Sequence, residues 1–342
     1  MRVAFDISPI KSGHQVRGIG SYTKSLQQAL SNLSTKDIEI TFIDSPSEHT
    51  EADIIHHPYF DIFFKTLNPK KNTKTVVTIH DVIPLVFPSY FQAGVRGYIN
   101  LFFQKRSLNR CAAIICDSKT SKSDIVEKLS QNPKKIHVVY LAPSKHFTKL
   151  KSAPLDIFKK YNLPKNFVLY VGDVNWNKNI ANLLNAVKLA QKNIVMVGKA
   201  LVDNQNPETE KINKLIKTLN IETLVHRTGY VPDPDLTKIY NTAQATVLPS
   251  FYEGFGLPIL ESMACGTPVI CSNNSSIAEI CGKSAIICDP TDPQDMANKI
   301  NDIFKLTPEK REALSKKLIQ HASKYSWEKS AKETIDVYKS VI

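Results

Sequence analysis

Two glutamates, Glu253 and Glu261, frame the segment of this chain with the clearest potential for chemistry. Glycines between them let backbone approach a ligand closely, and Pro258 suits the first position of a helix. This places Leu257 at the N-cap, where it offers no oxygen to the unpaired N–H groups of the first turn. We therefore expect a phosphate at this helix start, with Glu253 holding sugar hydroxyls and Glu261 within reach of a ribose. The backbone expected to line this ligand comprises Gly254, Phe255, Gly256 and Leu257.

The residues on both sides of this segment predict the strand and the helix that position it. The apolar run 245–250 predicts a short buried strand before it, and the helix is expected to run to about Cys265 and end at Gly266. Alternatively, Glu261 is only a first-turn acid favourable to the helix dipole and Glu253 a solvated loop residue. The two glycines and the poor cap together favour the ligand interpretation.

Several further motifs accompany this segment: Arg17-Gly18-Ile19-Gly20, Thr78-Ile79-His80-Asp81, Tyr170-Val171-Gly172 with Lys178-Asn179, Gly266-Thr267-Pro268-Val269-Ile270 and Tyr325-Ser326-Trp327-Glu328. With the two glutamates, this set resembles the retaining glycosyltransferases of family 4. The resemblance implies an α/β protein of the GT-B fold, with two Rossmann-like parallel-sheet domains facing across a cleft. It also implies a nucleoside-diphosphate sugar as donor and no required metal or other cofactor.

The N-terminal half holds three candidate positions for the donor or acceptor. The glycines Gly18 and Gly20 are expected in a loop before a helix, where backbone N–H groups could meet a diphosphate, although a flexible loop capped by Ser21 fits equally. Arg17 would add a positive charge beside them. His80 and Asp81 follow a strand, and ligands bind at the carboxyl ends of parallel strands. The resemblance assigns His80 to the reacting sugar, while Asp81 could instead cap a turn.

Other polar residues follow strands in the same way. His56 and His57 end a strand and are candidate residues for the cleft. Gly172 and Lys178 flank a loop before a helix that Asn179 could cap, and the lysine could neutralise a departing diphosphate.

The sequence departs from the family pattern at two positions in this loop. Asp173 and Asn177 stand where many relatives have arginine, which predicts a thinner phosphate clamp.

A pair of aspartates, Asp233 and Asp235, could suggest a divalent metal, but they precede a helix and act there as cap and first-turn charges. We expect no metal at this site. Tyr230 and Val231 are instead expected near the nucleotide base.

Strands alternating with helices predict parallel sheets built from βαβ units. We expect an acceptor-binding domain over 1–150, a nucleotide-sugar domain over 151–325, and a linker from about Leu141 to Pro164, rich in Pro, Lys and Ser. By the family resemblance, the helix from about 326 to 342 packs back on the first domain. The predicted strands are 2–8, 53–57, 74–80, 112–118 and 136–140, then 167–172, 194–198, 225–229, 245–250, 267–272 and 285–289; helices are expected near 21–33, 95–110 and 120–130.

Composition sets limits on location and partners. Residues 1–150 hold 20 Lys and Arg against 12 Asp and Glu, which is most of the net charge of +12. This surplus favours an acidic acceptor or an anionic membrane surface, and no nucleic-acid-binding motif accompanies it. The helix Val95–Arg110 and the loop Lys65–Lys74 could lie on a membrane, or the helix could simply bury one face on its sheet. With no apolar leader or membrane span, the protein is expected in the cytoplasm, peripheral to the inner membrane face, with its six cysteines reduced.

The family resemblance, taken with these observations, implies transfer of a hexose from a GDP- or UDP-linked sugar to a hydroxyl of a glycan or lipid-linked acceptor, with retention of configuration. No dedicated general base is evident, and the family mechanism lets the leaving phosphate accept the proton. Two alternatives remain open: a non-catalytic protein that binds nucleotide sugars, and a GT-B nucleotide-sugar epimerase.

Overall fold

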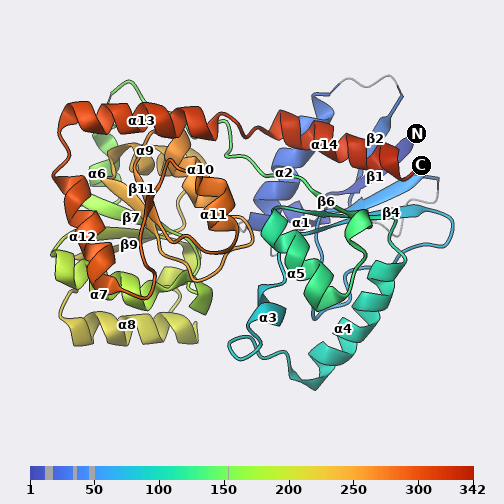
Figure 1. The fold of residues 1–342 in the computed structure, drawn as a ribbon, viewed down its shortest axis with the longest axis horizontal. Coiled ribbons are helices and arrows are strands. Elements are labelled where there is room, and N and C mark those ends of the chain that lie inside the picture. Colours follow the sequence, from blue (N-terminus) through green and yellow to red (C-terminus); the bar gives the residue numbers. More distant parts are fainter. Residues whose placement is uncertain (12–17, 34–36, 46–50, 153) are drawn as a thin grey trace. The chain divides into compact units, whose positions relative to one another are not determined.

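The computed structural model describes residues 1–11, 18–33, 37–45, 51–152 and 154–342, which form two compact units. Unit 1 contains residues 1–142 and 325–342, and unit 2 contains residues 143–324 (Figure 1). The chain therefore changes unit at Ala142, earlier than the predicted boundary at 150, and returns to unit 1 for its last helix. In the described part of the chain, no helix combines the length and apolar character that a bilayer crossing requires.

Unit 1 is built on a six-stranded parallel sheet in the order β2-β1-β3-β4-β5-β6. Its strands are β1 (Arg2–Asp6), β2 (Glu39–Ile43), β3 (Ile54–His57), β4 (Lys74–Ile79), β5 (Ala113–Cys116) and β6 (Ile136–Val138). The central strands are buried along almost their whole length, as expected for a parallel sheet with both faces covered. The exposed residues of β2 alternate with covered ones because it is an edge strand.

The helices of unit 1 are α1 (Ser8–Lys11), α2 (Gly18–Ser31), α3 (Ile83–Val86), α4 (Gly94–Asn109), α5 (Lys119–Leu129) and α14 (Trp327–Ser340), with a 3₁₀ turn at Pro133–Lys135. Helix α14 lies beside α2, although about 300 residues separate them in sequence (Figure 1). The Tyr338 hydroxyl lies 2.6 Å from Nδ1 of His56, and Ser330 donates to the carbonyl of Tyr140. The last helix is thus part of unit 1, as the resemblance implied.

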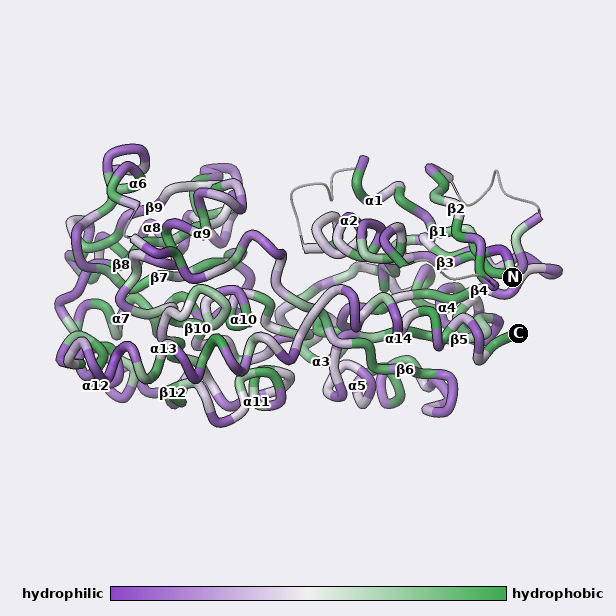
Figure 2. Tube along the Cα trace, turned by 90° about the horizontal axis from the view of Figure 1, so that it is seen from above, coloured by the Kyte–Doolittle hydropathy of each residue, from purple (hydrophilic) through white to green (hydrophobic). Residues whose placement is uncertain are grey.

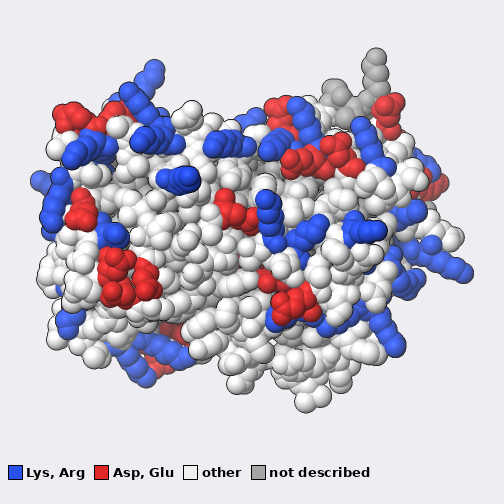
Figure 3. All heavy atoms as spheres, viewed as in Figure 1, with Lys and Arg blue, Asp and Glu red and all other residues white. Residues whose placement is uncertain are grey.

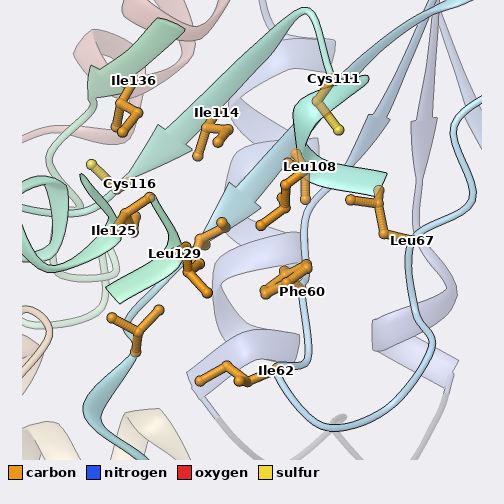
Figure 4. Close-up of a cluster of buried hydrophobic side chains, with 13 residues drawn as sticks. Phe60, Ile62, Leu67, Leu108, Cys111, Ile114, Cys116, Ile125, Leu129 and Ile136 are labelled. Atoms are coloured by element: carbon orange, nitrogen blue, oxygen red, sulfur yellow. The ribbon is translucent and has the colours of Figure 1, made fainter. Parts of the chain in front are cut away.

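One hydrophobic core of unit 1 lies between the sheet and helices α4 and α5 (Figure 4). Ile114 and Cys116 of β5 meet Ile125 and Leu129 of α5 there, and Leu108 is the main apolar side chain that α4 contributes. The cysteines behave as small core residues: all six, each within the described part of the chain, are buried and form no disulfide.

Unit 2 contains a second six-stranded parallel sheet in the order β12-β11-β10-β7-β8-β9. Its strands are β7 (Phe167–Val171), β8 (Asn193–Val197), β9 (Val225–Gly229), β10 (Ala245–Leu248), β11 (Val269–Cys271) and β12 (Ile286–Ile287). This is the strand order of the Rossmann fold, in which the order reverses between the first and fourth strands, here β7 and β10. Loops that follow these two strands are therefore neighbours.

The helices of unit 2 are α6 (Asp156–Lys160), α7 (Ile180–Ala190), α8 (Pro207–Leu219), α9 (Asp233–Thr242), α10 (Leu257–Ala264), α11 (Ser275–Cys281), α12 (Pro293–Phe304) and α13 (Pro308–Ala322), with 3₁₀ turns at Trp176–Lys178 and Lys199–Val202. Figure 2 shows the apolar green colour concentrated along the strands, while helices such as α12 and α13 alternate green and purple along their length. This is the pattern of amphipathic helices that cover an apolar sheet.

The predicted fold of two Rossmann-like parallel sheets is confirmed, and every predicted strand is present to within a few residues. Three details were wrong. Strand β2 was missed, helix α2 begins at Gly18 rather than near 21, and most of the predicted linker belongs to unit 2. Phe147, Ile157 and Leu163 are buried in the core of that unit, so their apolar side chains outweighed the Pro, Lys and Ser around them.

Candidate functional site

The two loops at the strand-order reversal of unit 2 meet through an ion pair. Lys178, after β7, places its ammonium 2.8 and 2.7 Å from the two carboxylate oxygens of Glu253, after β10. The glutamate is only 6% exposed, so it is not the solvated loop residue of the alternative interpretation. The lysine side chain is 19% exposed. An ammonium has three donors, and two point at Glu253, which leaves one for an anionic ligand.

Serine hydroxyls hold the loop that carries Glu253. The Ser250 hydroxyl donates to the Glu253 carboxylate at 2.7 Å. The backbone N–H of Glu253 donates to the Ser275 hydroxyl. Ser276 donates to the carbonyls of Glu253 and Phe255. These serines were not identified from the sequence, and the contacts of Ser275 and Ser276 depend on α11 returning to the loop. The carboxylate is therefore fixed in place before any ligand arrives.

The loop after Gly172 contains two buried asparagines, and one of them, Asn177, departs from the family pattern. Asn177 is buried and donates to the carbonyl of Tyr252, and its own carbonyl accepts from Phe251. Asn179 was expected to cap α7, but its amide instead donates to the carbonyls of Pro249 and Pro290. Both asparagines thus connect the β7 and β10 loops.

Gly172 lies in tight backbone packing. A Cβ on the neighbouring Gly198 would come 2.1 Å from the carbonyl oxygen of Gly172, so β7 and β8 approach closely at their carboxyl ends. A Cβ on Gly172 itself would come 2.9 Å from the Tyr170 hydroxyl, which donates to the carbonyl of Asp173.

Helix α10 starts without a side-chain cap. Its N-cap is Gly256, in the left-handed region at φ 96°, and no side chain in the described ranges accepts there. Leu257 was expected at this position and is instead the first helical residue, followed by Pro258. The shift of one residue leaves the conclusion intact, because neither glycine nor leucine has a side-chain oxygen. Gly254 and Phe255 are buried in the loop between Glu253 and this helix start.

Glu261 lies one turn into α10, buried, and accepts a 2.8 Å hydrogen bond from the Tyr240 hydroxyl. Burial raises the pKa of Glu261 to about 7, while the Tyr240 hydrogen bond partly opposes this increase. The partner Tyr240 of α9 was not identified from the sequence. It fixes one oxygen of the carboxyl group.

Tyr230 and Val231, expected near a nucleotide base, differ in exposure. Tyr230 is 54% exposed after β9, so its ring is open to a ligand, whereas Val231 is part of the hydrophobic core and offers only its backbone. The aspartates that follow lie in the first turn of α9, and Asp235 accepts from Lys160 and Tyr161. Within the described ranges, no group of three or more His, Cys, Asp or Glu is arranged to hold a metal ion.

In unit 1, His80 and Asp117 form a pair at the carboxyl ends of β4 and β5. Nδ1 of His80 is 2.7 Å from a carboxylate oxygen of Asp117, and Nε2 is 3.2 Å from the carbonyl of Pro58. Burial opposes the charged imidazole, but the negative Asp117, with Asp81 and the two hydrogen bonds, outweighs it and raises the pKa of His80. Asp117 was not identified from the sequence, although its place directly after a strand adjacent to β4 was the available signal.

The remaining predicted residues of unit 1 lie in varied surroundings. Asp81 accepts from the backbone N–H of Ile83, which is the turn-capping role considered for it. His57 is buried, and burial followed by the charge of Lys70 lowers its pKa to about 4. His56 is fully buried between Thr78 and Tyr338, which makes it a core residue rather than a candidate for the cleft.

The glycine motif at the start of α2 is helical rather than a loop. Gly18 and Gly20 lie in the first turn of the helix, Gly20 is buried, and Ser21 is inside the helix and does not cap it. A Cβ on Gly18 would meet nothing within 4 Å. The predicted Arg17 lies outside the described residues.

Family models match both units of the chain. The model for "Glycosyl transferases group 1" covers residues 155–321, and the model for "Glycosyltransferase Family 4" covers residues 45–142.

Among curated proteins, the O-antigen chain mannosyltransferase B of Escherichia coli is 32% identical over 99% of this chain and 92% of its own length. The serotype-specific mannosyltransferase WbdA of E. coli is 28% identical over 79% of this chain, which spans only 34% of WbdA.

Among solved structures, Anabaena HepE in complex with UDP and glucose has a TM-score of 0.75 at 18% identity, covering 99% of this chain and 100% of that one. The sucrose-phosphate synthase of Thermosynechococcus elongatus has a TM-score of 0.74 at 19% identity, covering 100% and 99% of the two chains. These two likenesses show the GT-B fold. The mannosyltransferase that is 32% identical over 99% of this chain, together with the two family models, shows that the chain belongs to glycosyltransferase family 4 and is a glycosyltransferase.

Proposed function

We propose that this enzyme transfers mannose from a nucleoside-diphosphate mannose to a hydroxyl of a growing glycan or lipid-linked glycan, retaining the anomeric configuration. The observation that carries the proposal is the Lys178–Glu253 pair beside the uncapped start of α10. Mannose is chosen because the curated relatives named above are mannosyltransferases, and one of them builds O-antigen chains.

The proposed donor site follows from the charge of its groups. A diphosphate carries negative charge that increases when the bond to the sugar breaks, so the site must supply positive charge at that point. Lys178 and the N-terminal dipole of α10 supply it, and Gly256 lets the helix start approach the phosphates. No step requires a metal ion in this scheme, and resistance to EDTA is its direct test.

The two glutamates have separate roles in the proposal. Glu253, held by Lys178 and Ser250, orients hydroxyls of the transferred sugar. Glu261 binds the ribose with the oxygen that Tyr240 does not occupy. Tyr230 packs against the base. The acceptor hydroxyl attacks C1 of the sugar on the face from which the diphosphate leaves, the bond between C1 and the diphosphate breaks, and the acceptor proton passes to the leaving diphosphate. Attack on that face retains the configuration.

His80 is the proposed functional histidine of unit 1. Both of its ring nitrogens face oxygen acceptors, so an imidazolium satisfies both hydrogen bonds. Asp117 holds the ring in orientation.

The proposal is tested with purified enzyme, a mannose-terminated oligosaccharide acceptor and a panel of GDP- and UDP-sugars, each with and without EDTA. A mannosylated product from one donor, formed at the same rate in EDTA and with the donor's anomeric configuration by NMR, supports it. Product of inverted configuration would refute the retaining mechanism, and loss of activity in EDTA would refute metal independence. No observation on the described residues favours either alternative, the non-catalytic protein that binds nucleotide sugars or the nucleotide-sugar epimerase.

A further inference from the structure

Helix α4 of unit 1 exposes most of its large apolar side chains and buries small and polar residues, which is the reverse of an ordinary amphipathic helix. Its buried positions are Gly97, Gln104 and Leu108, so the covered face contains a glycine and a polar amide. The outward face presents five large hydrophobic side chains: Val95, Tyr98, Ile99, Phe102 and Phe103. A helix that only covers its sheet would place these side chains inward.

The inward amide groups of α4 donate hydrogen bonds to the segment before the helix, and these bonds fix its orientation. The Gln104 amide donates to the carbonyl of Asp61 and to the Thr66 hydroxyl, and Asn100 donates to the carbonyl of Phe63. A Cβ on Gly97 would come 2.8 Å from that of Ala93, so no larger residue fits there. Rotating α4 to bury its aromatic face would leave these buried polar groups without partners.

The loop before α4 extends the same apolar surface. Asp61 accepts from the backbone N–H groups of Phe63 and Phe64, a turn that leaves Phe64 68% exposed. Phe63 in turn packs edge-on against Tyr98 of α4. We call Phe64, Val95, Tyr98, Ile99, Phe102 and Phe103 the α4 patch. Val95 is 79% exposed and Phe102 53%.

Cations accompany the aromatic rings of the α4 patch. The Lys65 ammonium lies 4.8 Å from the centre of the Phe103 ring, and the Arg106 guanidinium 4.3 Å from that of Phe102. From Ile62 to Cys116 the sequence has eight Lys and Arg and a single acidic residue. In Figure 3, the region where Figure 1 places α4 shows white atoms at its lower end and blue atoms along its outer edge.

We propose that the α4 patch docks unit 1 on an anionic lipid bilayer. Aromatic rings flanked by Lys and Arg suit the membrane interface, where the rings enter the acyl boundary and the cations meet lipid phosphates. A second copy of the chain is a poor occupant, because face-to-face pairing of two such patches would bring like charges together. The inference is independent of the donor and acceptor proposed above.

The test is flotation of the whole enzyme with phosphatidylcholine vesicles, either pure or with about a third phosphatidylglycerol. The wild type is expected to float with the anionic vesicles and much less with the neutral ones, and added salt should weaken the association. Ile99→Ser/Phe102→Ser is expected to lower the partition coefficient at least about tenfold. Lys65→Gln/Arg106→Gln should lower the partition coefficient on anionic vesicles only.

Matched controls use similarly exposed side chains of unit 2. Leu155→Ser/Leu189→Ser and Lys217→Gln/Lys310→Gln are expected to float like the wild type. Thermal unfolding should be the same in all variants because the substituted side chains are exposed. Mannosyl transfer to a soluble acceptor should also be the same, because none of these residues is in the proposed donor site. The inference is wrong if the wild type stays in solution with anionic vesicles or if the patch variants bind as well as the wild type. A dimer in light scattering that Ile99→Ser/Phe102→Ser abolishes would assign the patch to a second copy instead.

Discussion

The ammonium of Lys178 and the carboxylate of Glu253 are each the other's counter-ion inside a largely buried loop. Removing either charge leaves the other uncompensated, so the two side chains should act as a unit both in folding and in activity. The serines around Glu253 add to this rigidity.

Glu253→Gln is expected to lower kcat at least about a hundredfold, since the amide cannot orient sugar hydroxyls as the carboxylate does and releases Lys178. The change keeps the size of the side chain and one acceptor oxygen, so the fold should persist by circular dichroism, with a lower melting temperature because Lys178 loses its counter-ion. Glu222→Gln, at an exposed position in the same unit, is the control and should leave turnover unchanged. Wild-type turnover in Glu253→Gln would remove the glutamate from the proposed mechanism.

The buried Glu261 predicts a dependence of stability on pH. Its pKa in the folded state, about 7, lies above the ordinary value of 4.5, so the folded protein binds the extra proton in this interval. The contribution of Glu261 to stability is therefore fully present below about pH 4.5 and is lost as pH rises through 7. Glu261→Gln should make the urea midpoint fall less steeply between pH 5 and 7.5 than in the wild type. Equal slopes in the two proteins would contradict the raised pKa.

The His80–Asp117 pair predicts a shift that NMR can measure. Burial opposes the charged imidazole, and Asp117→Asn removes the negative charge that contributes most to offsetting it, so the pKa of His80 should fall from its raised value. His226, in the other unit, is a reference in the same spectra and should not move. An unchanged titration of His80 in Asp117→Asn would show that another group sets its pKa.

Helix starts and strand ends were harder to predict than the presence of the elements. Pro258 placed the start of α10 to within one residue, but Gly18 and Gly20 were assigned to a loop because glycines disfavour a helix interior. Strand β2 was missed, although Glu39–Ile43 has the alternation and the β-branched residues of a half-exposed strand. Partners such as Asp117, Tyr240 and Ser275 could not be predicted from spacing, because they come from elements adjacent only after the sheets form.

The two glycines at helix starts should respond oppositely to alanine. At Gly256, φ is 96°, a conformation that costs an L residue about 1–2 kcal/mol, so Gly256→Ala should destabilise unit 2 and distort the phosphate-binding loop. Gly18→Ala has open space around its Cβ and should raise stability by about 0.5–1 kcal/mol. Chemical denaturation of both variants checks this. A stable Gly256→Ala with full activity would refute the role given to that turn.

The chain as a whole returns to its first unit for its last helix, and this connection makes unit 1 depend on residues at both ends of the sequence. The motif Tyr325-Ser326-Trp327-Glu328 identified the helix, with Ser326 as its cap, but only the family resemblance indicated where it packs. The predicted boundary near residue 150 differs from the observed one because composition between 143 and 164 suggested a linker. Three apolar side chains in that segment are core residues of unit 2.

Truncation after Lys324 is expected to unfold unit 1 at a lower temperature while leaving unit 2 intact, because it uncovers α2 and removes the Tyr338 partner of His56. Tyr338→Phe removes only the hydroxyl that contacts His56 and should lower the free energy of unfolding of unit 1 by about 1 kcal/mol. Calorimetry with separate transitions for the two units would show this. Equal loss of stability in both units would contradict the division described here.

Mannosyl transfer at the Lys178–Glu253 site is best tested with a panel of donors and a mannose-terminated acceptor. We expect EDTA-resistant formation of a mannosylated product from one nucleoside-diphosphate mannose, with the anomeric configuration retained and the reaction nearly abolished in Glu253→Gln. A folded wild-type enzyme that makes product only from a sugar other than mannose, or a Glu253→Gln variant as active as the wild type, would contradict it.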